Sequence, residues 1–177
     1  MRILIATPLY PPDTAPAAQY VKELALRLSH THTITVLAYG ELPEKVAGAR
    51  IISVSKKRPL AVRLFAFTQA LVQEVRRADI VYLENGASVQ LPAFIVSFFT
   101  HAPHILHYGD TLAAKRRGMT DVIDRITRTR VARIVRDLPQ PRPEILPFAS
   151  HPTKALDAYD ESWTRHIQTL NEIFAHA

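Results

Sequence analysis

The sequence predicts an α/β protein: a single Rossmann-like three-layer domain with a mostly parallel sheet and a C-terminal helix packed on it. Two observations lead to this prediction. Short β-prone apolar runs alternate with amphipathic helical segments, in the order strand-helix-strand-strand-helix-strand-helix-strand, which is typical of parallel α/β folds. The chain also has 177 residues and is 47% hydrophobic, enough for the core of one domain and too short for two ordinary ones.

The first strand and helix organise the remaining chain. Residues 2–7 form an unbroken β-prone run, which favours a central strand of a parallel sheet over an alternating edge strand. Four prolines then exclude regular structure up to about residue 17. A helix follows, because apolar residues recur at i, i+3, i+4 and i+7 (Val21, Leu24, Ala25 and Leu28).

The pattern predicts four further strands, at residues 33–37, 50–54, 79–83 and 104–107. One helix is expected to begin near Pro59. Residues 89–99 form a second helix that is apolar nearly all round, so we expect it to be heavily buried or to face a membrane or partner. A basic, weakly amphipathic helix is expected at 120–137. The expected organisation is a Rossmann-like domain at 1–137, a proline-rich connector at 138–158 and a docking helix at 159–177.

Composition excludes several classes of protein. The chain has no cysteine, which excludes a disulfide scaffold, a thiolate zinc site and a cysteine nucleophile, and fits a reducing cytoplasm. No secretory signal is expected, and no apolar run reaches the roughly 18 residues of a membrane span. We therefore expect a cytoplasmic protein, with peripheral attachment to a membrane as an additional expectation.

Positive charge is concentrated late in the chain. Net charge is +6, and residues 115–142 contain nine Lys or Arg and three Asp. Such a stripe favours anionic partners, and the plainer interpretation is a solvated helix face. The residues singled out for binding an anionic surface are Lys115, Arg116, Arg117 and Arg128. Nucleic acid is not expected as a partner, because neither interleaved aromatic residues nor a recognition helix is evident.

Three loops are expected to meet at the carboxyl edge of the sheet, at residues 8–18, 84–88 and 107–111. Ligands of open α/β sheets bind at this edge. Converging His and Asp side chains can orient a hydroxyl or act as general acid or base. The alternative is ordinary turn chemistry, since Asn85-Gly86 and Gly109-Asp110 are common turn pairs. The polar side chains carried by these loops are Asp13, Thr14, Glu84, Asn85, His107, Tyr108 and Asp110.

Several known chemistries lack their motifs. No metal site is predicted, because His104 and His107 would point to opposite faces of a strand. No P-loop, Gly-x-Ser-x-Gly or Ser-His-Asp order is present. The first loop has no glycine, which argues against a dinucleotide-binding dehydrogenase.

Four segments together carry a family resemblance: MRILIATPLYPPDTAPAAQYVKELALRLS, THTITVLA, ADIVYLENGASVQLPAFIVSFF and APHILHYGDTLAAKR. Their order and spacing resemble the N-terminal domain of family-4, GT-B-fold glycosyltransferases. The closing ESWTRHIQTLNEIF is similar to the last helix of such enzymes, which crosses back onto the N-terminal domain. The resemblance covers about residues 1–130 and, more weakly, 159–175.

The resemblance implies retaining transfer of a sugar from a nucleotide-sugar donor to an acceptor hydroxyl, with the acceptor bound by the N-terminal domain, often at a membrane surface. Under it, Asp110 or His107 would handle the acceptor hydroxyl. Acceptor-binding residues would be Asp13, Thr14, Glu84, Asn85, Tyr108 and Gly109, with Pro16 and Ala17 as a loop wall.

Two departures from the family pattern shape the expected function. The glycine pair of the first loop is replaced by residues 15–18, Ala-Pro-Ala-Ala, which hinders backbone approach to a donor phosphate. The C-terminal nucleotide-sugar domain and its Glu-x7-Glu motif are not found. We therefore expect no cofactor and an incomplete donor site.

Two functions follow from these departures. The first is acceptor binding in a half glycosyltransferase that needs a donor-domain partner. The alternative is a non-catalytic, degenerate half-enzyme that acts as a binding or interaction module. Self-association into a homo-oligomer is also expected, because a lost domain would leave its packing surface exposed.

Overall fold

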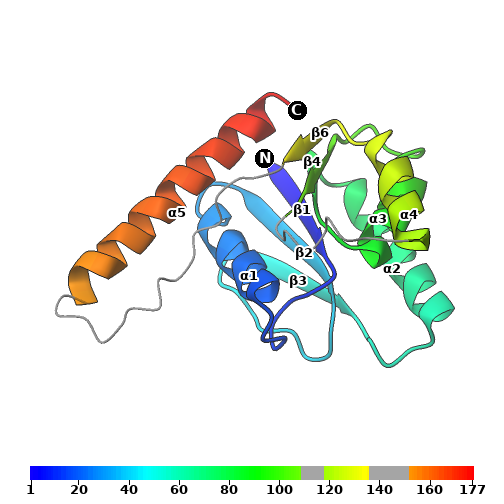
Figure 1. The fold of residues 1–177 in the computed structure, drawn as a ribbon, viewed down its shortest axis with the longest axis horizontal. Helices are drawn as coiled ribbons and strands as arrows, with labels where there is room; N and C mark the ends of the chain where they lie inside the picture. Colours follow the sequence, from blue (N-terminus) through cyan, green and yellow to red (C-terminus); the bar gives the residue numbers. More distant parts are fainter. Residues whose placement is uncertain (109–117, 136–151) are drawn as a thin grey trace.

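The protein forms one parallel sheet flanked by two layers of helices (Figure 1). The computed structural model describes residues 1–108, 118–135 and 152–177. In this part of the chain the sheet has six strands in the order β3-β2-β1-β4-β5-β6, and each neighbouring pair is parallel. This confirms the Rossmann-like three-layer prediction, with a sheet that is wholly parallel rather than mostly so. The strands are β1 (Arg2–Thr7), β2 (Thr33–Tyr39), β3 (Ala49–Val54), β4 (Ile80–Glu84), β5 (His104–His107) and β6 (Arg133–Val135).

The helices divide between the two faces of the sheet. Helices α1 (Pro16–Leu28) and α5 (Pro152–Ala175) cover one face, and α2 (Leu60–Val75) and α3 (Ala87–Val96) cover the other, where α4 (Met119–Arg128) packs beside α3. Each face has its own hydrophobic core. Alternate residues of β1 supply both, since Ile3 and Ile5 point toward α1 and α5, while Leu4 and Ala6 point toward α2 and α3.

The prediction of a helix at 120–137 is wrong for the second half of that range. Helix α4 ends at Arg128, and residues 133–135 form β6, which pairs with β5 in the register Leu106↔Ile134. The β-branched sequence around Ile134 suits a strand, and pairing with the edge of β5 outweighs the weak helical periodicity. Sequence periodicity had assigned Ile134 to a helix face.

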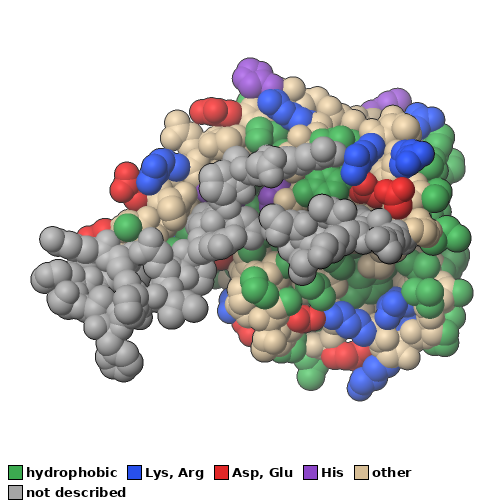
Figure 2. Space-filling model, viewed as in Figure 1, with side chains coloured by type: hydrophobic (Ala, Val, Ile, Leu, Met, Phe, Trp, Pro, Cys, Tyr) green, Lys and Arg blue, Asp and Glu red, His purple; other side chains and the backbone are tan. Residues whose placement is uncertain are grey.

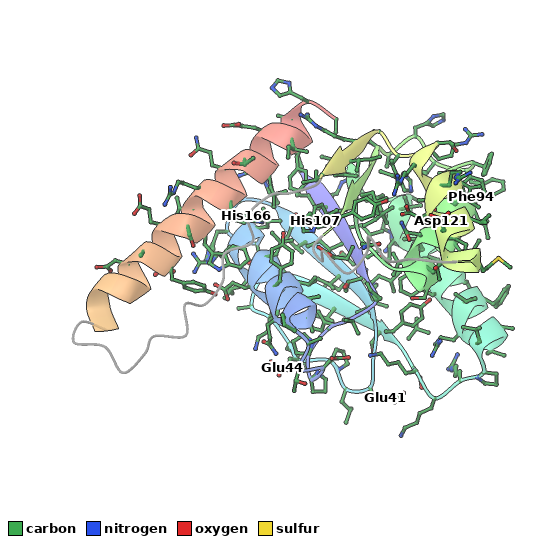
Figure 3. All side chains as sticks on the ribbon, viewed as in Figure 1. Glu41, Glu44, Phe94, His107, Asp121 and His166 are labelled. Atoms are coloured by element: carbon green, nitrogen blue, oxygen red, sulfur yellow. The ribbon has the colours of Figure 1, made fainter. Side chains whose placement is uncertain are left out.

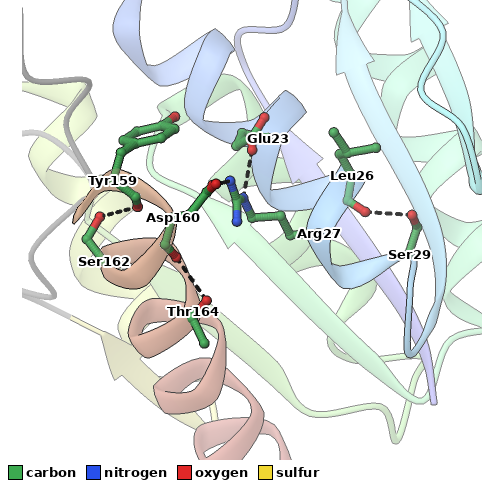
Figure 4. Close-up of polar contacts among 8 residues, drawn as sticks. All are labelled: Glu23, Leu26, Arg27, Ser29, Tyr159, Asp160, Ser162 and Thr164. Atoms are coloured by element: carbon green, nitrogen blue, oxygen red, sulfur yellow. Dashed lines mark hydrogen bonds and ion pairs between the residues drawn. The ribbon is translucent and has the colours of Figure 1, made fainter. Parts of the chain in front are cut away.

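Helix α5 docks on the first helix of the domain. It begins at Pro152, earlier than the expected boundary at residue 159, and most of the expected connector lies outside the described residues. Arg27 of α1 donates to Glu23 and to Asp160 of α5, each at 2.6 Å (Figure 4). The same guanidinium lies over the ring of Trp163, 5.3 Å from its centre. The buried side chains of α5 that join the core are Trp163, Leu170 and Phe174.

The apolar helix expected at 89–99 is only partly buried. Helix α3 ends at Val96, and its inner residues Val89, Ala93 and Val96 reach the core. Phe98 and Phe99, in the turn that follows, are 52% and 78% exposed. The prediction was heavy burial or a face toward a membrane or partner. The inner side of the helix is buried, and Ile95 on its outer side is 43% exposed.

In the described part of the chain, no helix is long and apolar enough to cross a membrane. Those residues also contain no group of three or more His, Cys, Asp or Glu side chains that could hold a metal ion.

Candidate functional site

The candidate site lies where the strand order reverses. Strand β1 is followed by α1 on one face of the sheet, and its neighbour β4 is followed by α3 on the other face. This divergence opens a crevice in most α/β folds. Here the two loops meet, because a Cβ at Gly86 would lie 2.9 Å from Cγ of Pro8. Gly86 therefore allows the loop after β4 to pack directly on the first proline of the loop after β1.

The loop after β1 is held by Asp13. Its Oδ1 accepts from the backbone N–H of Ala15 at 3.1 Å, and its Oδ2 forms an ion pair with Lys56 at 3.0 Å. These two hydrogen bonds lower the pKa of Asp13, and the one from Lys56 has the larger effect. Asp13 thus fixes the turn into α1. Of the other predicted residues here, Thr14 and Pro16 are exposed and Ala17 is half-buried.

Glu84 and His107 form a buried pair at the ends of β4 and β5. The two residues are partners in the strand register, and Nδ1 of His107 lies 2.8 Å from Oε1 of Glu84. His107 is 0% exposed and Glu84 is 4% exposed. Among the described residues, Nε2 of His107 has no hydrogen-bond partner. With an ionised Glu84, the imidazole donates from Nδ1 and keeps its lone pair on Nε2.

Aromatic rings cover this pair on the α1 and α5 side of the sheet. The rings of Tyr20 and Tyr82 lie 5.5 Å and 5.6 Å from the ring of His107. The Tyr20 hydroxyl is 3.2 Å from that of Tyr82 and 2.8 Å from Nε2 of His166. Burial raises the pKa of both tyrosines well above the ordinary value, so the hydroxyls stay protonated. Figure 3 marks His107 on β5 and His166 on α5.

Trp163 closes the cluster from α5. Its ring stacks on Tyr20 with centroids 5.7 Å apart and an interplanar angle of 19°. Trp163 is 1% exposed, and its Nε1 has no partner among the described residues. The cluster therefore contains two buried polar nitrogens without a hydrogen-bond partner there, Nε1 of Trp163 and Nε2 of His107. Such atoms are uncommon in protein cores, and a role in binding or catalysis is one explanation for them.

A second polar network lies on the other side of β5. The Tyr108 hydroxyl donates to Oδ1 of Asp124 at 2.5 Å, and Gln90 donates to the same oxygen at 2.7 Å. Arg128 forms an ion pair with Asp124 and also donates to the Tyr108 hydroxyl at 3.0 Å. Burial is the main cause that raises the pKa of Tyr108. The network ties α4 to α3 and to the end of β5.

The structure thus brings together part of the predicted set. Glu84, Asn85, His107 and Tyr108 meet at the ends of β4 and β5, where the Asn85 N–H donates to the His107 carbonyl at 3.1 Å. Arg128, expected to bind an anionic surface, is engaged with Asp124 instead of projecting as an unpaired cation. The predicted residues that lie outside the described part of the chain are Gly109, Asp110, Lys115, Arg116 and Arg117.

Sequence reasoning missed four residues of the cluster. Tyr82 carried a usable signal, because it stands two residues before Glu84 and must share its face of the strand. Tyr20, Trp163 and His166 carried none beyond a place on an amphipathic helix, since their meeting depends on how α1 and α5 pack.

Comparison with known proteins supports the fold assignment. No family model matches the chain, and no curated protein matches it. Among solved structures, HepE from Anabaena in complex with UDP-glucose matches with a TM-score of 0.55 and 17% identity, covering 76% of this chain and 36% of HepE. The UDP-GlcNAc 2-epimerase from Neisseria meningitidis bound to UDP-GlcNAc matches with a TM-score of 0.50 and 13% identity, covering 74% and 39% of the two chains.

These similarities identify a Rossmann-like domain of GT-B-like architecture. At such identities they show the fold alone. The chain spans less than two fifths of the length of the two proteins it matches.

Proposed function

We propose that this chain is the acceptor-binding part of a glycosyltransferase-like protein with GT-B-like architecture. It binds a sugar or lipid-linked acceptor at the carboxyl edge of the sheet, beside Glu84 and His107. A partner chain or second subunit supplies the nucleotide-sugar site. The observation that carries the proposal is the buried Glu84–His107 pair with Nε2 of His107 unpartnered among the described residues.

The pair has the chemistry of a general base. Glu84 holds the Nδ1 proton, so the lone pair of the imidazole is on Nε2. During transfer Nε2 takes the proton of the acceptor hydroxyl as that oxygen bonds to the anomeric carbon of the donor sugar. The nucleoside diphosphate leaves with the electron pair of the bond that breaks. Glu84 acts through His107 and is a positioning residue.

Other predicted residues retain their proposed roles. Asp110, which lies outside the described residues, assists His107 with the acceptor hydroxyl. Thr14, Asn85 and Gly109, the last of which also lies outside the described residues, bind the acceptor, and Pro16 and Ala17 form one wall. Tyr20 and Tyr82 cover His107 and must shift for an acceptor to reach Nε2.

The alternative is a non-catalytic binding module. The specific observation that favours it is the 0% exposure of His107, together with the close contact between Gly86 and Pro8 where the two loops meet. In that case the Glu84–His107 pair is structural, and the edge of the sheet binds a glycan, lipid or protein without turnover.

Saturation-transfer NMR on the intact chain tests the proposal, with glucose, galactose, mannose, N-acetylglucosamine and UDP-glucose as probes. We expect transfer to at least one free sugar. This signal should be lost in Asn85→Ala and in His107→Gln, and retained in Gln73→Ala, an exposed site on α2. Circular dichroism confirms that each variant is folded.

Three results would count against the proposal. Absence of transfer to every free sugar would leave the acceptor site without a ligand, and transfer that is retained in His107→Gln would favour the non-catalytic module, in which the Glu84–His107 pair is structural. Strong transfer to the uridine protons of UDP-glucose would assign the donor site to this chain.

A further inference from the structure

Exposed hydrophobic side chains gather on one helical layer. Of the eleven large hydrophobic residues that are exposed in the described part of the chain, eight belong to α2, α4, or α3 and the turn after it. Figure 2 shows hydrophobic atoms along the side of the molecule formed by these helices. We call this surface the outer helical face, defined by Leu60, Val62, Phe65, Ile95, Phe98, Phe99, Met119 and Val122.

Positive charge surrounds the outer helical face. Segments 57–78, 87–101 and 118–135 together contain nine Lys or Arg and only three acidic residues. Each of these acids has a cationic partner: Glu74 pairs with Arg50, Asp121 with Arg125 and Asp124 with Arg128. The opposite layer differs, since α1 and residues 157–175 of α5 contain five acidic residues and three Lys or Arg. Among the described segments, the layer of α2, α3 and α4 therefore carries an excess of positive charge, and the layer of α1 and α5 does not.

Aromatic and cationic groups are interleaved at the end of α3. The guanidinium of Arg130 lies over the ring of Phe98, 4.1 Å from its centre, and Phe94 meets the same ring edge-on at 5.2 Å. Phe99 beside them and Phe65 on α2 are 78% and 72% exposed. Phenylalanine rings this accessible to water indicate a surface that is covered by another molecule.

We infer that the outer helical face docks on a membrane surface rich in anionic phospholipid. Apolar side chains enter the boundary between headgroups and acyl chains while the surrounding arginines meet lipid phosphates, as in other interfacial helices. A second copy of the chain is a poorer occupant, because two such faces would oppose like charges. The inference shares Arg125, Arg128, Arg130 and Arg133 with the basic stripe expected at 115–142 and adds the exposed apolar side chains of α2, α3 and α4. It does not depend on the proposed function.

Co-sedimentation of the intact protein with lipid vesicles tests this inference. We expect binding to vesicles of phosphatidylglycerol and phosphatidylcholine, weak binding to phosphatidylcholine alone, and release by added salt. The double variant Phe65→Ser, Phe99→Ser should lower the partition coefficient about tenfold or more, since both rings lose their burial in lipid. The double variant Arg58→Gln, Arg130→Gln should lower the partition coefficient on the anionic vesicles and leave binding to phosphatidylcholine vesicles unchanged.

Matched controls lie away from the face. Leu42→Asn removes an apolar side chain that is 91% exposed, and Arg165→Gln removes an exposed cation of α5, so both should bind like the unchanged protein. Absence of vesicle binding overturns the inference and leaves a protein partner as the occupant. Equal loss in the controls, or no loss in the phenylalanine variant, also overturns it. A dimer that the phenylalanine variant converts to a monomer in light scattering would identify a second copy as the occupant instead. None of these measurements uses a sugar, so failure here leaves the proposed function unaffected.

Discussion

His107 Nδ1 lies 2.8 Å from Glu84 Oε1, and the two residues are register partners on neighbouring parallel strands. The contact joins the last residues of β4 and β5, so it fixes the starting points of the two loops that follow. It also assigns the imidazole proton to Nδ1 when Glu84 is ionised. A buried pair of this kind costs free energy to desolvate and must keep its geometry to remain favourable.

Two substitutions of Glu84 distinguish the hydrogen bond that its oxygen accepts from the effect of its negative charge. Glu84→Leu leaves the Nδ1–H of His107 unsatisfied in the core and should lower the free energy of unfolding by about 1–3 kcal/mol. Glu84→Gln keeps an acceptor oxygen and should cost less. Urea denaturation followed by circular dichroism measures both. A smaller loss for the leucine variant than for glutamine would show that the hydrogen bond adds nothing to stability.

Gly86 is required where two loops touch. In Gly86→Ala the added Cβ would lie 2.9 Å from Cγ and 3.1 Å from Cβ of Pro8, within a rigid ring. We expect a loss of about 1–3 kcal/mol from overpacking. Gly40→Ala is the matched control, because nothing lies within 4 Å of its added Cβ. Equal unfolding midpoints for the two variants would contradict the close contact.

Docking of α5 is reported by Trp163, which is the single tryptophan of the chain and is 1% exposed. Leu170→Ala, at a fully buried position of α5, should lower the free energy of unfolding by about 2–5 kcal/mol. Tryptophan emission should then move to longer wavelength at a lower urea concentration. Gln168→Ala, at an exposed position of the same helix, should have little effect. We expect fluorescence and circular dichroism to give one coincident transition. A fluorescence transition that precedes the other would show that α5 undocks separately.

Asp79 makes the free energy of unfolding depend on pH in the acidic range. The side chain of Arg2 donates to Oδ1 and its backbone N–H donates to Oδ2 at 2.7 Å, which lowers the pKa of Asp79 to about 2. Since the pKa in the unfolded chain is about 3.9, this contribution is present above pH 4 and is lost as pH falls toward 2. Asp79→Asn should therefore flatten the fall in urea midpoint across this range. Asp157→Asn, at an exposed carboxylate of α5, is the control. A steeper fall in Asp79→Asn would contradict the sign.

Much of the fold follows from local sequence pattern. Buried β-branched runs and i, i+3, i+4 stripes predicted the first five strands, because these signals depend on nearby residues. The pattern failed at residues 133–135, where a three-residue strand is too short to show a period of its own and gains its hydrogen bonds from β5. It also failed to place the start of α5 at Pro152.

The candidate site, like the fold, was predictable from the sequence only in part. From the sequence alone, Glu84, Asn85, His107 and Tyr108 could be placed at one edge, because parallel strands bring their carboxyl ends together. Only the tertiary structure decided that Glu84 pairs with His107, that Tyr108 turns toward Asp124, and that Tyr20, Tyr82, Trp163 and His166 complete the cluster. These contacts join residues as many as 146 positions apart. Strand and helix periodicity determines which side of an element a residue faces, whereas its contacts depend on how separate elements pack.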